Sequence, residues 1–154
     1  MSFLDDYNII RLNRYNNHRG DCLGKILIVE DEEIIANGLA AITKSIDPDL
    51  DITMTGYASE ALKFTEINQY DAFILDIQLN DYSGLELAKE IRNIDKYKMT
   101  PIVFITAIPT RELIAFKEIH CYDYIVKPFK EEKVREVLET IINYGIKSER
   151  KKKS

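Results

Sequence analysis

The chain has 154 residues, of which 45% are hydrophobic and 31% charged, and its formal net charge at pH 7 is −5. This length accommodates one domain with short extensions, and the acidic balance argues against a protein whose main task is to hold nucleic acid. No apolar run approaches the length of about 18 residues that a membrane-spanning helix needs. The cysteines Cys22 and Cys121 have no partners at metal-ligand spacing, which indicates free thiols and a cytoplasmic protein.

Both ends of the chain differ from its middle. Residues 1–24 are rich in Asn, Asp, Arg and Tyr without a steady period, so we expect an extension outside the fold. Residues 147–154 form a basic tail or linker, and a solvated charge run explains them better than a nucleic-acid site. The predicted domain therefore covers residues 25–146.

Five short segments have the composition of β-strands. Unbroken apolar runs at 26–29, 72–75 and 102–105 indicate strands that are buried on both faces. Residues 51–55 alternate polar and apolar side chains, which is typical of a half-exposed edge strand. The fifth predicted strand covers residues 123–126.

Apolar residues at helical spacing follow each predicted strand. The predicted helices cover approximately residues 35–46, 58–65, 84–94, 111–118 and 134–142. Thr110 is the predicted N-cap of the fourth helix, and we expect the fifth helix to end near Gly145. Five strand–helix pairs in succession predict an α/β fold with a parallel sheet and helices on both faces. The edge and inner strands fit the flavodoxin-like (βα)5 order 2-1-3-4-5.

Chemically reactive side chains follow four of these strands. Glu30 and Asp31 follow the first, Asp76 the third, Thr106 ends the fourth, and Lys127 follows the fifth. Because the carboxyl ends of parallel strands share one rim, we expect these side chains to converge. Three crowded carboxylates need a cation, and an oxygen-only set of ligands favours Mg²⁺.

This arrangement predicts a phosphoryl-transfer site. The Asp76 carboxylate would attack phosphorus, while Mg²⁺ and Lys127 neutralise the phosphoryl oxygens. Lys127 would pair with Asp76 before the reaction. Taken singly, each residue has a simpler explanation: Asp76 as a loop cap, Glu30 and Asp31 as acids at a helix start, Lys127 as a surface lysine.

Four motifs resemble the receiver domain of two-component response regulators over about residues 25–146. They are ILIVEDE, FILDIQLNDYSGLEL, VFITA and DYIVKPF. The segments HCYDYIVKPF and IVFITA are most similar to the corresponding segments of receivers attached to LytTR-type DNA-binding domains.

The resemblance implies roles for individual residues. It implies that Asp76 is phosphorylated by a sensor histidine kinase and that Mg²⁺ is bound by Glu30, Asp31, Asp76 and the backbone carbonyl of Gln78. The implied phosphoryl-sensing pair is Thr106 and Lys127. Tyr124, three residues before Lys127, matches the aromatic switch that turns inward on activation, although an ordinary edge-strand tyrosine would look the same.

The resemblance also implies partners. Phosphorylation would change the face formed by helix four, strand five and helix five, for a downstream protein, an attached output domain or a phosphorylation-linked homodimer. Nucleic acid would be bound only through an output domain. The chain would catalyse no reaction beyond its own phosphorylation and dephosphorylation.

Other functions are also open at this point. One is the receiver part of a longer LytTR-type transcription regulator. Another is an aspartate-nucleophile phosphohydrolase, but Gln78 occupies the position where such enzymes carry a second acid. A nucleotide-binding module lacks support because acids, not glycines, follow the first strand.

The chain departs from the family pattern at two places. Asn80 stands where the family often has proline, so we expect a looser loop after Asp76. His120 and Cys121 replace a common Gly-Ala pair, and we predict that His120 lies on the surface and Cys121 is a small buried residue.

Overall fold

The computed structural model describes residues 24–148. The predicted extension at 1–24 and the basic tail at 147–154 lie almost wholly outside these residues. Within the described part, five strands form one parallel sheet in the order β2-β1-β3-β4-β5, as predicted. The strands are β1 Lys25–Val29, β2 Asp51–Thr55, β3 Ala72–Leu75, β4 Ile102–Thr106 and β5 Asp123–Val126.

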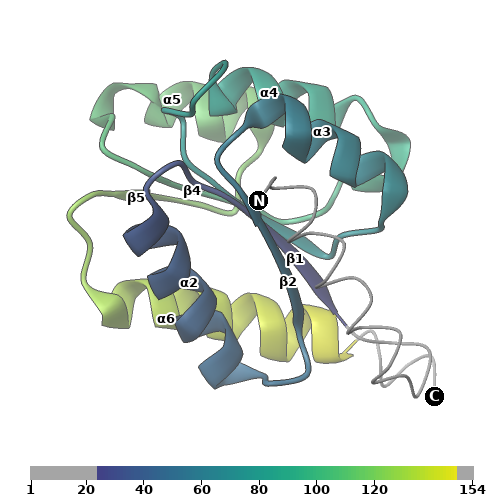
Figure 1. The fold of residues 1–154 in the computed structure, drawn as a ribbon, viewed down its shortest axis with the longest axis vertical. Coiled ribbons are helices and arrows are strands. Elements are labelled where there is room, and N and C mark those ends of the chain that lie inside the picture. Colours follow the sequence, from purple (N-terminus) through teal and green to yellow (C-terminus); the bar gives the residue numbers. More distant parts are fainter. Residues whose placement is uncertain (1–23, 149–154) are drawn as a thin grey trace, which may run out of the picture.

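Helices cover both faces of the sheet (Figure 1). The α-helices are α2 Glu33–Ile46, α3 Ala58–Ile67, α4 Gly84–Arg92, α5 Glu112–Ile114 and α6 Glu131–Thr140. Short 3₁₀ turns are η1 Asp95–Tyr97 and η2 Pro109–Arg111, and π-helical turns are η3 Ala115–Ile119 and η4 Ile141–Ile146. In Figure 1, α3, α4 and α5 lie above the sheet, and α2 and α6 lie below it.

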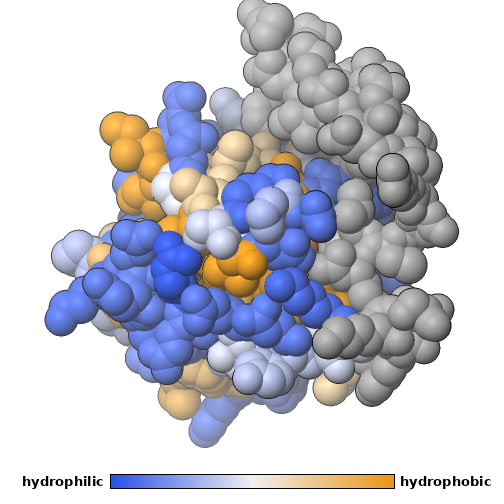
Figure 2. Space-filling view, turned by 90° about the horizontal axis from the view of Figure 1, so that it is seen from below, coloured by the Kyte–Doolittle hydropathy of each residue, from blue (hydrophilic) through white to orange (hydrophobic). Residues whose placement is uncertain are grey.

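The core has two layers because successive residues of a strand point to opposite faces of the sheet. From β1, Leu27 and Val29 join the layer under α3 and α4, whereas Ile26 and Ile28 join the layer under α2 and α6. The outer surface on the α2 and α6 side is mostly hydrophilic, with smaller apolar areas between the polar side chains (Figure 2). The solid apolar runs of the sequence are thus explained by burial on both faces.

The edge strand β2 is more buried than its pattern predicted. Its position at the edge is confirmed, but Thr53 and Thr55 are buried like Ile52. The Thr55 hydroxyl donates to Oε1 of Glu60 at 2.7 Å, so this polar side chain is satisfied inside the fold. Alternating composition therefore marked the edge position correctly but overstated the exposure.

Two predicted helix boundaries are wrong. Thr110 is not an N-cap, because it lies inside the 3₁₀ turn Pro109–Arg111 and α5 begins only at Glu112. The fixed φ of Pro109 suits a first helical position, which starts the turn one residue earlier. Gly145 does not end the last helix, since the π-helical turn runs through Ile146.

Among residues 24–148, no helix combines the length and the apolar character needed to cross a bilayer.

Candidate functional site

The rim at the carboxyl ends of the strands is held by hydrogen bonds that continue past the strands. The amide of Glu30 donates to the carbonyl of Thr55, and that of Asp76 to the carbonyl of Val29, both at 2.9 Å. On the other side, the amide of Lys127 donates to the carbonyl of Thr106 at 2.8 Å. The backbones of these three residues are therefore fixed by the sheet itself, which restricts where their side chains can reach.

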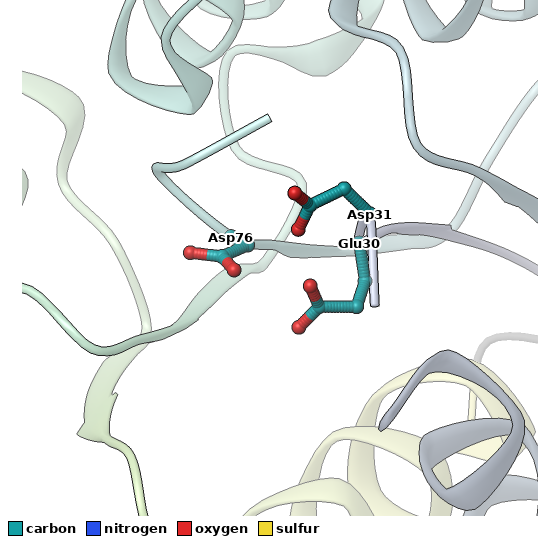
Figure 3. A group of neighbouring side chains, drawn as sticks. All are labelled: Glu30, Asp31 and Asp76. Atoms are coloured by element: carbon teal, nitrogen blue, oxygen red, sulfur yellow. The ribbon is translucent and has the colours of Figure 1, made fainter. Parts of the chain in front are cut away.

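Three carboxylates meet at this rim. Glu30, Asp31 and Asp76 each offer an oxygen atom, and these oxygens all lie within 4.8 Å of one another. Figure 3 shows Asp76 coming from the end of β3 and the other two from the end of β1. Glu30 and Asp76 are 4% and 3% exposed, whereas Asp31 is exposed. An oxygen-only set with one accessible member fits a hard divalent cation such as Mg²⁺.

Lys127 lies between two of these acids. Its Nζ atom is 2.8 Å from Oδ2 of Asp76 and 2.6 Å from Oε1 of Glu30. Burial opposes the charge on Lys127, but hydrogen bonds with Asp76 and Glu30 outweigh it and raise the pKa of the lysine. The predicted pairing with Asp76 is present, and the second pairing, with Glu30, was not anticipated.

The buried carboxyl of Glu30 is hard to ionise. Desolvation is the largest cause, and it raises the pKa of Glu30 to about 7 even though Lys127 and the amide of Glu32 favour the charged form. The nearby charge of Asp76 adds to the rise. The crowding that the sequence implied thus adds to the effect of burial at Glu30.

Thr106 and Tyr124 both form hydrogen bonds with the backbone of Ile108, in the loop after β4. The Thr106 hydroxyl is fully buried and accepts from the amide of Ile108 at 3.3 Å. Tyr124 is 7% exposed, and its hydroxyl donates to the carbonyl of the same Ile108. The side chain of Tyr124 is thus already in an inward position, and Ile108 links the two predicted switch residues.

Gln78 is tied to the acceptor residue through its backbone. Its amide donates to Oδ1 of Asp76 at 3.1 Å, while its side chain is exposed. Together with Lys127 on Oδ2, this bond fixes the orientation of the Asp76 carboxylate. The predicted role of Gln78 is that of a carbonyl ligand from this same short loop.

Gly84 is a residue of the site that the sequence analysis treated only as the start of a helix. A Cβ atom at Gly84 would lie 1.9 Å from the carbonyl oxygen of Asp76, which no side chain permits. The amide of Gly84 donates to the carbonyl of Ile77 at 2.8 Å, and Ser83 caps α4. The start of α4 is therefore packed directly against the backbone of Asp76.

A hollow opens beside this cluster. Its volume is about 470 Å³, and its lining residues are Glu32, Ile35, Ala107, Lys127, Pro128 and Phe129. One of them, Lys127, also belongs to the site, so the hollow borders the site on the side of α2.

The predictions for His120 and Cys121 are confirmed. His120 is exposed and adopts a left-handed conformation with φ of 55°, which ends the π-helical turn η3. Cys121 is buried, and burial together with the charge of Asp123 raises the pKa of its thiol to about 12.

Comparison with known proteins places this chain in one family. The family model of the response regulator receiver domain matches residues 26–139. A sensory transduction protein LytR from Staphylococcus saprophyticus is 35% identical over 118 residues, which are 76% of this chain and 45% of that protein. Its counterpart from Staphylococcus epidermidis is 34% identical over 131 residues, or 84% of this chain and 50% of that protein. The chain thus spans about half the length of these curated relatives.

Solved structures agree with this assignment. The response regulatory domain of protein mrkE from Klebsiella pneumoniae has a TM-score of 0.69 and 29% identity, covering 78% of this chain and 96% of that one. The chemotaxis response regulator CheY4 of Vibrio cholerae has a TM-score of 0.68 and 25% identity, covering 77% and 98%. The chain therefore belongs to the response regulator receiver domain family of two-component signalling systems.

Proposed function

We propose that Asp76 is the residue of this receiver domain that accepts a phosphoryl group, donated by a sensor histidine kinase. The observation that carries the proposal is the contact between Oδ2 of Asp76 and Nζ of Lys127, at 2.8 Å, beside the carboxyls of Glu30 and Asp31. This contact supports the proposal, because the positive charge of Lys127 would offset the negative charge that gathers on the oxygens of an incoming phosphoryl group.

The reaction is a displacement at phosphorus. A carboxylate oxygen of Asp76 forms the new O–P bond while the P–N bond of the donor histidine breaks, and the imidazole nitrogen keeps the electron pair. The product is an aspartyl phosphate, in which the single negative charge of the carboxylate is replaced by a phosphoryl group that carries about −1.5 to −2 charges by analogy with other phosphorylated side chains. Lys127, already held at the site by Glu30, pairs with the new phosphoryl oxygens.

Mg²⁺ is the cofactor that the acidic cluster would hold. Its ligands would be Glu30, Asp31, Asp76 and the backbone carbonyl of Gln78. When bound, it neutralises charge on the transferring group. The same cation would relieve the repulsion that contributes to the high pKa of Glu30.

The response would travel through Thr106 and Tyr124. The Thr106 hydroxyl, now bonded to the amide of Ile108, would turn to a phosphoryl oxygen and release that amide. Because the hydroxyl of Tyr124 holds the carbonyl of Ile108, the β4–α5 loop would move with both residues. The face made by α5, β5 and α6 would change for a downstream protein, a second copy or an attached domain.

The test of the acceptor is phosphorylation of the purified protein by a small acyl phosphate in the presence of Mg²⁺. The native protein and Asp95→Asn, which changes an exposed aspartate in η1, are expected to label equally. Asp76→Asn is expected not to label. Labelling of Asp76→Asn at the native rate would overturn the assignment.

A second candidate concerns the whole protein. The matching Staphylococcus aureus relatives are named transcriptional regulatory protein LytR, and the chain covers 46% of their length. We therefore also propose that this receiver controls a DNA-binding output domain encoded in the same gene. The gene sequence beyond the codon for Ser154 decides this: a stop codon there would contradict the proposal.

A further inference from the structure

The loop between β3 and α4 is fastened to the start of α3. The carboxylate of Asp81 accepts from the amide of Ala58 at 2.7 Å and from the amide of Ser59 at 2.9 Å. These are the first two amides of α3, whose own N-cap residue, Tyr57, makes no side-chain cap bond. Asp81 thus caps a helix 23 positions earlier in the sequence, where a negative charge is also favoured by the helix dipole.

A second bond joins the same two loops. The amide of Asn80 donates to the carbonyl of Gly56 at 3.1 Å. Proline, which the family often has at this position, has no N–H group and could not make this bond. The loop that we expected to be looser without this proline is therefore attached to Gly56 by a bond that proline could not make.

Gly56 extends this attachment to Asp31. A Cβ atom at Gly56 would lie 2.7 Å from Nδ2 of Asn80 and 3.1 Å from Cα of Asp31. The glycine backbone is thus packed between the side chain of Asn80 and the backbone of Asp31. The loop that carries Asp31 and the loop that carries Gln78 therefore both pack against Gly56.

We propose that Asp81 is a positioning residue for the metal site, clamping the loop that presents Gln78 to the N-terminus of α3. The inference deepens the proposed function, because the carbonyl of Gln78 and the carboxylate of Asp31 are two of the proposed Mg²⁺ ligands. Asp81 contacts neither the cation nor the phosphoryl group. It acts by holding the ligand-bearing loop in register.

The clamp stays in place over the working range of pH. Although partial burial opposes ionisation, hydrogen bonds from Ser59, Ala58 and Tyr82 lower the pKa of Asp81 to about 2. The acceptor oxygens are therefore available at neutral and mildly acidic pH.

The test is calorimetric titration of Mg²⁺ into the folded proteins, well below their unfolding temperatures. Asp81→Ala removes both acceptor oxygens, and its Kd for Mg²⁺ is expected to rise by about 10-fold or more. Asp81→Asn keeps one acceptor oxygen and is expected to give an intermediate Kd. Ile142→Val, which trims a fully buried side chain in the layer under α2 and α6, is expected to lower Tm without changing the Kd.

The control separates positioning from a general loss of stability. A native Kd in Asp81→Ala, or in Asp81→Asn should the alanine variant not fold, would overturn the clamp. If Ile142→Val raised the Kd as much as Asp81→Ala, the effect would be one of stability and the inference would be wrong. An absence of saturable Mg²⁺ binding in the native protein would contradict the proposed metal site as well as the clamp. This result is distinguishable from the other two, in which the native protein binds Mg²⁺.

Discussion

The Nζ atom of Lys127 lies 2.6 Å from Oε1 of Glu30, and the two side chains are only 10% and 2% exposed. The same ammonium group is 2.8 Å from Asp76. One lysine therefore contacts two buried carboxyl groups that follow different strands.

Removing that charge should destabilise the fold. We expect Lys127→Met to lower the free energy of unfolding by about 3–5 kcal/mol, because it leaves buried carboxylates unpaired. Saturating Mg²⁺ should raise the stability of the variant by more than it raises that of the native protein, since the cation replaces the missing lysine. Urea unfolding with and without Mg²⁺ measures both effects.

Lys133→Met is the matched control, because Lys133 pairs with Asp123 at 3.4 Å and its side chain is 52% exposed. Such an exposed pair contributes at most about 1 kcal/mol. Equal losses in the two lysine variants, or an equal gain from Mg²⁺ in the native protein and Lys127→Met, would contradict the described role of Lys127.

Gly84→Ala should disturb the acceptor directly. The new methyl group would lie 1.9 Å from the carbonyl oxygen of Asp76, so either the loop or α4 must move. We expect a loss of more than about 2 kcal/mol in stability and a strong loss of Mg²⁺-dependent phosphorylation. Gly38→Ala is the control: nothing lies within 4 Å of its added Cβ in α2, so a gain of about 0.5–1 kcal/mol is expected. A fully active and stable Gly84→Ala protein would show that the close packing is wrong.

The thiol of Cys121 should react slowly with alkylating reagents, and it should make the stability of the fold depend on pH in the alkaline range. In a Cys22→Ser background, iodoacetamide at pH 8 should alkylate the folded protein far more slowly than the unfolded chain, since the buried thiol has a raised pKa of about 12. The folded pKa lies above the ordinary value of 9.0, so the stabilising contribution is complete below pH 9 and is lost as the pH rises towards 12. Cys121→Ala should remove this part of the alkaline decline. Identical alkaline profiles for the two proteins would refute the raised pKa.

Arg92 should be a strong determinant of stability. Its guanidinium donates to the carbonyls of Ile119, Tyr97 and Thr100 at 2.7 Å each, and to that of His120 at 3.1 Å. Arg92→Lys cannot reproduce this fork, and we expect a loss of about 2–3 kcal/mol from the carbonyls left without a donor.

Arg135→Lys provides the comparison for Arg92, because Arg135 uses its guanidinium on the exposed Glu131 and on Ser45. A loss below about 1 kcal/mol is expected there. Chemical denaturation gives both values, and similar losses at the two arginines would contradict the structural role of Arg92.

The sheet and its rim were predictable because the signals are local. An apolar run such as Phe73–Leu75 can be satisfied only by burial on both faces, and a polar residue directly after it must lie at the rim. The position of Asp76 followed from that argument alone. The parallel order then brought Glu30 and Lys127 to the same place.

The contacts that hold the site were not predictable, since they join distant parts of the chain. The sequence around Ala58 does not indicate that Asp81 caps α3. The sequence around Arg92 does not indicate that its guanidinium donates to the carbonyl of Ile119. The Thr110 cap failed for the opposite reason: a plausible local signal was overridden by the neighbouring Pro109. Periodicity places elements, whereas loop-to-loop hydrogen bonds depend on the finished fold.

The most direct measurement is chemical identification of the modified residue. The protein is treated with an acyl phosphate and Mg²⁺, reduced with borohydride, which converts an aspartyl phosphate to homoserine, and sequenced by mass spectrometry. We predict homoserine at position 76 and unmodified aspartate at position 31. Homoserine at another aspartate, with position 76 unchanged, would contradict it.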